Sequence, residues 1–235
     1  MATPERGALP LHTQIAELLI RDVASGRLID GEKLKPERDM AAGMGIAVGT
    51  LRKALHKLTA IGMLERVQGS GNFIRAKAKP IAVYSLFRLE LLQGGGLPTA
   101  RILEIARLKK DAALPSFGVA PEAHRIRRLR YLSGVPAALE EIWLDGTIVE
   151  NIAVEDVSDS LYLYYRQSLG LWISRVEDSV GQGILPDWAP PEFPLAHGAL
   201  LPMVTRVSFG QDGQSAEASL TWFDPGTTRY LARFS

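Results

Sequence analysis

The segment IAVGTLRKALHKL, residues 46–58, is the feature of this sequence that most restricts its fold. Apolar residues recur there at the spacing of one helical face, which includes Leu51, Leu55 and Leu58. The other side carries a hydroxyl and several basic groups, from Thr50, Arg52, Lys53, His56 and Lys57. We therefore expect a short helix that packs one side into a core. A solvated surface explains its basic side simply, and a surface for nucleic acid explains it more specifically.

The surrounding residues predict a three-helix unit followed by a hairpin. The periodicity of Leu11 to Gly26 predicts a first helix that ends at the glycine, and PERDMAAGMG predicts a second helix with Pro36 in its first turn. Residues 63–67 and 72–75 alternate like strands and are joined by the glycine-rich QGSG. This order of elements is that of a winged helix-turn-helix.

The length of 235 residues predicts two domains. We assign residues 1–75 to the winged helix-turn-helix, residues 76–100 to a linker and a first strand, and residues 101–235 to a second domain. In that domain, stretches that turn at LSGVP and GQDGQ predict antiparallel strands, SLYLYYRQSLG predicts a helix, and PEFPLAHG fits a helix or a loop. Consecutive antiparallel strands with a few separate helices predict an α+β fold.

Composition excludes several classes of function. The net charge is only +1, although residues 1–75 hold 11 Lys and Arg against 8 Asp and Glu, which makes the head mildly basic. Cysteine is absent, which excludes disulfides and thiolate metal sites. The four histidines lack metal-ligand spacing, so we expect neither a metal nor another cofactor. No apolar run approaches the roughly 18 residues of a membrane span, and the start has no signal-peptide core; both indicate a cytoplasmic protein without a membrane partner.

Three stretches of the head carry a family likeness: LHTQIAELLIRDVASGRLIDGEKL, PERDMAA and GTLRKALHKLTAIGMLERVQGSGNFI. In this order and spacing they resemble the DNA-binding domain of the GntR family of bacterial transcription regulators. The resemblance implies that Arg38, Thr50 and Arg52 contact the DNA backbone and base edges. It also implies that the wing tip enters or approaches the minor groove through Gly69, Ser70 and Gly71.

The chemistry of these side chains agrees with those roles. Thr50 and Arg52 fall in the first turn of the third helix, where a recognition helix meets the major groove. An arginine binds a guanine edge with two parallel donors, whereas a threonine suits a phosphate or a thymine methyl. Lys53 and Lys57 lie further along, and we expect them at phosphates, where they add affinity without sequence preference.

The head also departs from the family pattern. Ala47 and Val48 stand where members usually carry Ser or Thr and then Arg, so one expected arginine and the usual N-cap hydroxyl are absent. A good bidentate contact discriminates between bases by roughly 1–3 kcal/mol, so we expect an operator different from the common family type. Lys35 and Pro36 also depart from the family and are expected to shift the start of the second helix.

The second domain carries IRRLRYLSGVPAALEEIWL, SLYLYYRQSLGL and PMVTRVSFGQDGQSAEASLTWF. Together these stretches resemble the UTRA effector-binding domain of the HutC-type branch of the family, whose fold is similar to chorismate lyase. The resemblance covers most of residues 101–230. It implies a ligand pocket lined by Arg128, Arg130, Glu140, Ser160, Tyr162 or Tyr164, and Glu217.

Arg128 and Arg130 alternate on a predicted strand, so both face the same side of a sheet. Two guanidinium groups on one cavity suit a carboxylate or a phosphate, and Glu140 on the next strand would accept a hydrogen bond from a ligand hydroxyl or amine. Two alternatives stay open. The RIRRLR run also fits an exposed strand edge, and Glu141 competes with Glu140 for the inward position.

These features predict a metabolite-responsive transcription regulator, most simply a repressor. A homodimer would bind an inverted-repeat operator in double-stranded DNA and would be switched by a small acidic metabolite. The alternative is an enzyme of chorismate-lyase-like fold fused to a DNA-binding head. We expect no enzyme, because the sequence shows no Ser/His/Asp order, phosphate loop or metal cluster.

Overall fold

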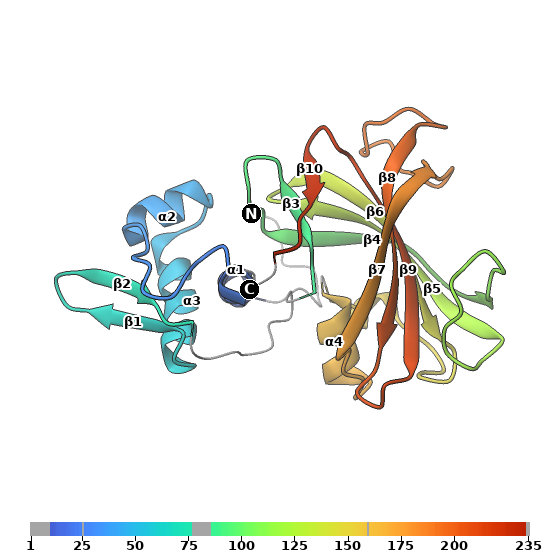
Figure 1. Ribbon diagram of the computed structural model, residues 1–235, viewed down its shortest axis with the longest axis horizontal. Helices are drawn as coiled ribbons and strands as arrows, with labels where there is room; N and C mark the ends of the chain where they lie inside the picture. The colour runs from blue at the N-terminus through green and yellow to red at the C-terminus, as the bar shows by residue number, and fades with distance from the viewer. Residues whose placement is uncertain (1–9, 25, 77–85, 159, 234–235) are drawn as a thin grey trace. The chain divides into compact units, whose positions relative to one another are not determined.

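The computed structural model describes residues 10–24, 26–76, 86–158 and 160–233 (Figure 1). Its contacts divide the chain into two compact units, one built mainly from Leu9–Arg88 and the other from Leu89–Tyr230. Of residues 76–100, which are expected to hold a linker and a first strand, residues 77–85 lie outside the described residues, and Leu89–Leu91 form a short strand.

Three helices form most of the first unit, at the places where periodicity predicts them: α1 (Leu11–Ala24), α2 (Glu37–Gly43) and α3 (Val48–Ala60). The expectation for Pro36 was wrong. Pro36 has an extended ψ of 139° and stands just before α2 as its N-cap residue, so the helix begins one residue later. Glu37 and Asp39 then occupy the first turn, where the helix dipole favours acidic groups. At the end of α3, Gly62 adopts a φ of +74°, which stops the helix.

A two-stranded hairpin follows α3. Strand β1 (Leu64–Val67) pairs antiparallel with β2 (Gly71–Ile74), with Val67 opposite Gly71. Gly69 and Gly71 have φ values of +73° and +120°, which residues with a side chain rarely adopt, so the tip depends on glycine.

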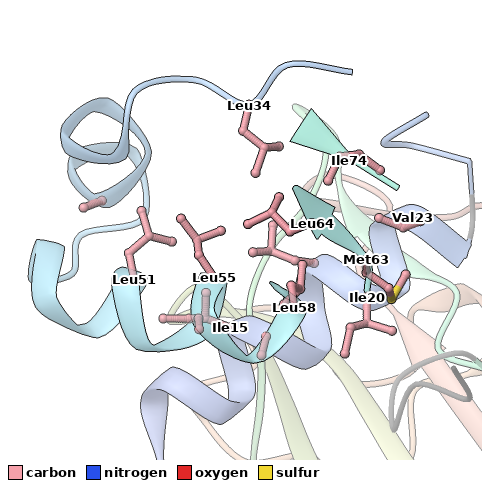
Figure 2. Packing of buried hydrophobic residues seen from close by; sticks show 14 residues of the cluster. Ile15, Ile20, Val23, Leu34, Leu51, Leu55, Leu58, Met63, Leu64 and Ile74 are labelled. Carbon is pink, nitrogen blue, oxygen red and sulfur yellow. The ribbon is translucent and has the colours of Figure 1, made fainter. Parts of the chain in front are cut away.

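Buried apolar side chains from all three helices and the hairpin form a cluster in the first unit (Figure 2). Leu51, Leu55 and Leu58 of α3 are fully buried there, together with Ile15 of α1 and Ile74 of β2. Burial of one such side chain stabilises the fold by about 1.5–3 kcal/mol. Because three of them project from one side of α3, the opposite side of that helix must face outward.

The second unit is built on a six-stranded antiparallel sheet with the order β4-β5-β6-β9-β8-β7. Its strands are β4 (Pro98–Lys109), β5 (Glu122–Leu132), β6 (Val135–Asp145), β7 (Arg175–Ile184), β8 (Leu200–Phe209) and β9 (Ser215–Phe223). A separate small sheet pairs β3 (Leu89–Leu91) with β10 (Thr228–Tyr230). The antiparallel strands and the few helices confirm the α+β fold.

The connections follow the predicted turns. Ser133 and Gly134 join β5 to β6 with φ values of 49° and 80°, the backbone of a tight two-residue hairpin turn. Between β6 and β7 lie the short 3-10 helix η1 (Val154–Asp156) and the helix α4 (Leu161–Ser168). Residues 191–198, PEFPLAHG, form turns and no helix. Within the described residues, no helix combines the length and the apolar character needed to cross a membrane.

Register gives the large sheet two different faces. On one face Leu129, Leu139 and Trp222 are cross-strand neighbours and belong to an apolar cluster. On the other face Arg128 lies opposite Glu140, which lies opposite Thr221. Helix α4 contacts this second, polar face, because the Tyr162 hydroxyl lies 3.2 Å from Oε1 of Glu217 on β9.

We expect Leu55→Ala to destabilise the first unit by about 2–5 kcal/mol, because the lost side chain leaves a cavity in a fully buried position. The free energy of unfolding from a urea titration measures this. Ile29→Ala is the control: the residue is 62% exposed, and the change in the free energy of unfolding should stay within about 0.5 kcal/mol. Equal losses for the two variants would contradict the packing described above.

Candidate nucleic-acid interface and buried polar site

The outer side of α3 is exposed and basic. The Arg52 side chain is 64% exposed, Lys53 and His56 are exposed, and Thr50 is half-buried. Thr50 lies in the first turn of the helix, and none of these side chains points into the apolar cluster. The structure thus presents the side chains that the sequence singled out on one accessible side of the helix.

An ion-pair bridge that the sequence did not reveal lies beside this surface. Oε2 of Glu37 on α2 is 2.7 Å from Nε of Arg52, and Oε1 is 3.1 Å from Nη2 of Arg66 on β1. The hydrogen bond from Arg52, with the charges of Arg52 and Arg66, holds the pKa of Glu37 below its usual value, although burial opposes this shift. Glu37 therefore remains ionised at neutral pH.

The other basic candidates differ in their surroundings. Nζ of Lys57 lies 3.5 Å from Oε1 of Glu17 on α1, and its side chain is 41% exposed. Arg38 is exposed on α2. The hairpin tip, Gly69, Ser70 and Gly71, is exposed throughout, and the Ser70 amide donates to the Val67 carbonyl at 3.0 Å.

Helix α3 begins without a side-chain cap. Its N-cap residue is Ala47, with an extended ψ of 140°, and no side chain accepts a hydrogen bond from the first turn. The structure therefore agrees with the sequence, which indicated that α3 has no N-cap hydroxyl. Val48 follows as the first helical residue and is half-buried against the apolar cluster.

Three charged residues meet on the polar face of the large sheet. Arg128, Arg130 and Glu140 are 6%, 3% and 6% exposed. Nη2 of Arg130 lies 3.1 Å from Oε2 of Glu140, and Nε of Arg128 donates to the same oxygen. Burial alone would raise the pKa of Glu140, but the two guanidinium charges and their hydrogen bonds hold it below the usual value. The charges of these three side chains sum to +1, and both arginines make further interactions beyond Glu140.

Two open alternatives are decided by this geometry. Strand β5 pairs with β4 on one side and with β6 on the other, so the RIRRLR run does not lie on a sheet edge. Glu141 projects to the opposite face from Glu140, where Oε2 of Glu141 accepts from Nε of Arg127 at 2.8 Å. Glu140 is therefore the residue that shares a face with Arg128.

A second polar group on the same face centres on Glu217 of β9, which is 2% exposed. Its Oε1 accepts from Ser208 Oγ at 2.9 Å and from the Tyr162 hydroxyl at 3.2 Å. Its Oε2 and the buried Tyr165 hydroxyl have no hydrogen-bond partner of good geometry within the described residues, although the two groups lie close enough to interact with each other.

Burial dominates the protonation of this group. It raises the pKa of Glu217 above its usual value, despite hydrogen bonds to the carboxylate and the nearby charge of Arg206. Burial and the neighbouring Glu217 charge also raise the pKa of Tyr162 and Tyr165. The site therefore favours neutral forms of all three groups.

Ser160 and Tyr164 are placed differently from the other expected pocket residues. Ser160 is the N-cap of α4, where its Oγ accepts from the Leu163 amide at 3.4 Å. Tyr164 is buried, with its ring centroid 6.0 Å from that of Tyr165. Of the two tyrosines that the sequence left open, Tyr162 rather than Tyr164 hydrogen-bonds Glu217.

Sequence reasoning missed a third polar group on this face. Nε and Nη2 of Arg206 on β8 lie 2.6 and 2.7 Å from the two carboxylate oxygens of Asp178 on β7, and the Tyr230 hydroxyl donates to Asp178 at 2.7 Å. Its only signal in the sequence was an arginine and an aspartate on two predicted strands. Among the described residues, no group of three or more acidic or histidine side chains is arranged to hold a metal ion.

Comparisons with known proteins match both units. The family of bacterial regulatory proteins called gntR matches residues 11–74, and the UTRA domain matches residues 93–228. The HTH-type transcriptional regulator SmoD of Agrobacterium fabrum is 60% identical over 227 residues, which cover 97% of each chain. The mannosyl-D-glycerate transport/metabolism system repressor MngR of Escherichia coli is 26% identical and covers 93% of each chain.

Solved structures give the same fold. The crystal structure of YydK from Bacillus subtilis is similar with a TM-score of 0.55 and 22% identity, over 97% of this chain and 100% of that one. The two relatives reported above are transcription regulators, which supports a regulator over the enzyme alternative. The chain belongs to the GntR family of bacterial transcription regulators, in its HutC-like branch, with a DNA-binding winged helix-turn-helix and a UTRA domain.

Proposed function

We propose that this regulator is a repressor, that it binds an inverted-repeat operator as a homodimer, and that a small acidic metabolite in the UTRA domain switches it. The observation that carries the proposal is the pairing of an exposed basic helix side in one unit with buried, convergent polar groups in the other. The relative MngR is by name a repressor.

In the proposed DNA complex, α3 lies in the major groove. Arg52, with its exposed guanidinium, reads a base edge, and half-buried Thr50 contacts a phosphate or a thymine methyl. Arg38, Lys53 and Lys57 meet phosphates, and the exposed tip Gly69, Ser70 and Gly71 approaches the minor groove. The two glycines support a role of the tip at the minor groove, because at these positions no side chain separates the backbone from the DNA.

In the proposed effector site, the net positive charge of the Arg128, Arg130 and Glu140 cluster attracts a carboxylate or phosphate. Oε2 of Glu217 and the Tyr165 hydroxyl, which lie close to each other, supply hydrogen-bonding groups for the polar remainder of the ligand. Tyr162 and Ser208 orient Glu217, while Ser160 and Tyr164 shape the site through α4. The name of MngR refers to mannosyl-D-glycerate, which bears a carboxylate, and this supports an acidic effector here.

The switch follows from symmetry. A dimer that presents two copies of α3 binds two half-sites only when their spacing matches the DNA. A metabolite that favours another dimer geometry by a few kcal/mol releases the operator.

We expect Arg52→Ala and Lys53→Ala to differ in how they weaken DNA binding. Arg52→Ala should cost about 1–3 kcal/mol on an operator obtained by random-site selection and should relax preference at one base pair. Lys53→Ala should weaken operator and random DNA alike and reduce the salt slope by about 1. Fluorescence anisotropy over a range of salt concentrations measures both. Lys109→Ala, on an exposed basic residue of the other unit, should change neither quantity.

We expect acidic compounds to release the operator and their neutral counterparts to fail. A panel of sugar phosphates and sugar acids, each paired with the parent sugar, tests this by anisotropy of labelled operator DNA. Release by parent sugars alone would refute the acidic effector while leaving DNA binding intact. Recovery of each compound unaltered after long incubation would further separate a regulator from an enzyme.

We expect Glu217→Gln to stabilise the UTRA domain at neutral pH and to lose this effect in acid. The folded-state pKa of Glu217 is raised, so its contribution is complete below the unfolded value near 4.5 and is lost as pH rises through the folded pKa. Glutamine does not ionise, so the variant does not lose stability in this pH range. Urea unfolding between pH 4 and 8 measures the difference. Glu155→Gln, at an exposed glutamate, should give a flat difference; a flat difference for Glu217→Gln would contradict the raised pKa.

A further inference from the structure

The Glu37 bridge places an acid in the middle of a surface proposed to meet DNA. The Glu37 side chain is 20% exposed, whereas those of its partners Arg52 and Arg66 are 64% and 54% exposed. A carboxylate near phosphates weakens affinity by repulsion. If Glu37 has a role that offsets this loss of affinity, it acts through the side chains that it contacts, Arg52 and Arg66.

The bridge uses one specific nitrogen of Arg52. Glu37 accepts from Nε at 2.7 Å, on the side of the guanidinium next to the side-chain stem. No hydrogen bond of Nη1 or Nη2 of Arg52 is found within the described residues. The two terminal nitrogens are the donors that bind a guanine edge as a pair. The contact therefore holds the stem of Arg52 and leaves its recognition end for DNA.

The same carboxylate reaches the wing. Nη2 of Arg66 donates to Oε1 of Glu37, and Nε of Arg66 donates to Oδ1 of Asn72 on β2 at 3.3 Å. Asn72 is only 7% exposed, so this end of the chain of bonds is anchored in the hairpin. Elements α3, α2, β1 and β2 are thereby joined by polar side chains.

We propose that Glu37 is a positioning residue for sequence reading, which orients Arg52 toward a guanine edge and fixes the hairpin relative to α3 through Arg66. The inference rests on the proposed role of α3 in the major groove. Arginine has a long, flexible side chain, and holding it in its bound geometry lowers the entropy lost on binding the correct base. Glu37 thus lowers general affinity and raises the preference for operator over random DNA.

The test compares Glu37→Gln with Asp39→Asn in the full-length protein. Asp39 is exposed in the same turn of α2 and makes no hydrogen bond or ion pair within the described residues. Both variants remove one negative charge, but only Glu37→Gln breaks the ionic bridge. Anisotropy measures affinity for a selected operator and for random DNA of the same length, and thermal unfolding checks the fold.

We expect Glu37→Gln to reduce the ratio of operator to random affinity by about 10- to 100-fold, the discrimination of one bidentate contact. Random DNA should bind more tightly to both variants, because both lose an acid. Asp39→Asn should leave the ratio unchanged. In an Arg52→Ala background, Glu37→Gln should reduce the ratio far less, because Glu37 acts mainly through Arg52.

Two outcomes would overturn the inference. One is an unchanged ratio in Glu37→Gln with tighter binding to both DNAs, which would make Glu37 a repulsive charge only. The other is a full reduction of the ratio that persists in the Arg52→Ala background. Failure of the unaltered protein to prefer any selected operator would instead count against the proposed function itself.

Discussion

The burial of one side of α3 is the constraint on which the proposed DNA surface depends. Leu51, Leu55 and Leu58 are fully buried against α1 and the hairpin, so the helix has one stable rotation about its axis. That rotation sets Thr50, Arg52 and Lys53 outward. The orientation of the proposed reading surface is thus a result of apolar packing on the opposite side of the helix.

In the second unit, a group of charged side chains is buried, whereas those of α3 are exposed. There, Arg128, Arg130 and Glu140 lie inside the protein, where an isolated charge would be very unfavourable and where one carboxylate stabilises two guanidinium groups. We propose above that an anionic effector binds this cluster. Glu217 shows the opposite response to burial, because its neighbours do not compensate the charge and its pKa rises.

The sequence predicted most of the helices and strands, because the helical spacing of apolar residues and the alternation typical of strands are both strong in it. The amphipathic helices and the antiparallel pairs at LSGVP and GQDGQ lie where expected, and alternation placed Arg128 and Arg130 on the same face. The residue opposite Arg128 on the neighbouring strand was harder to predict from the sequence. Regular pairing from the turn would place Leu139 opposite Arg128. A register shift between Arg130 and Tyr131 instead places Glu140 opposite Arg128. The local sequence contains no feature that predicts this shift. Glu37 was missed because its partners lie 15 and 29 residues away along the chain.

The two outer strands of the large sheet have a further consequence. A sheet with open edges offers its backbone as a template to strands from other molecules, which leads to aggregation. Strand β4 carries exposed Arg101, Arg107 and Lys109 along one edge, and β7 begins with exposed Arg175 and Glu177 at the other edge but exposes Val180 and Ile184 further along. An incoming foreign strand would have to strip water from these full charges. These charges therefore oppose the addition of a foreign strand along β4 and at the start of β7, whereas Val180 and Ile184 leave the later part of β7 without that protection.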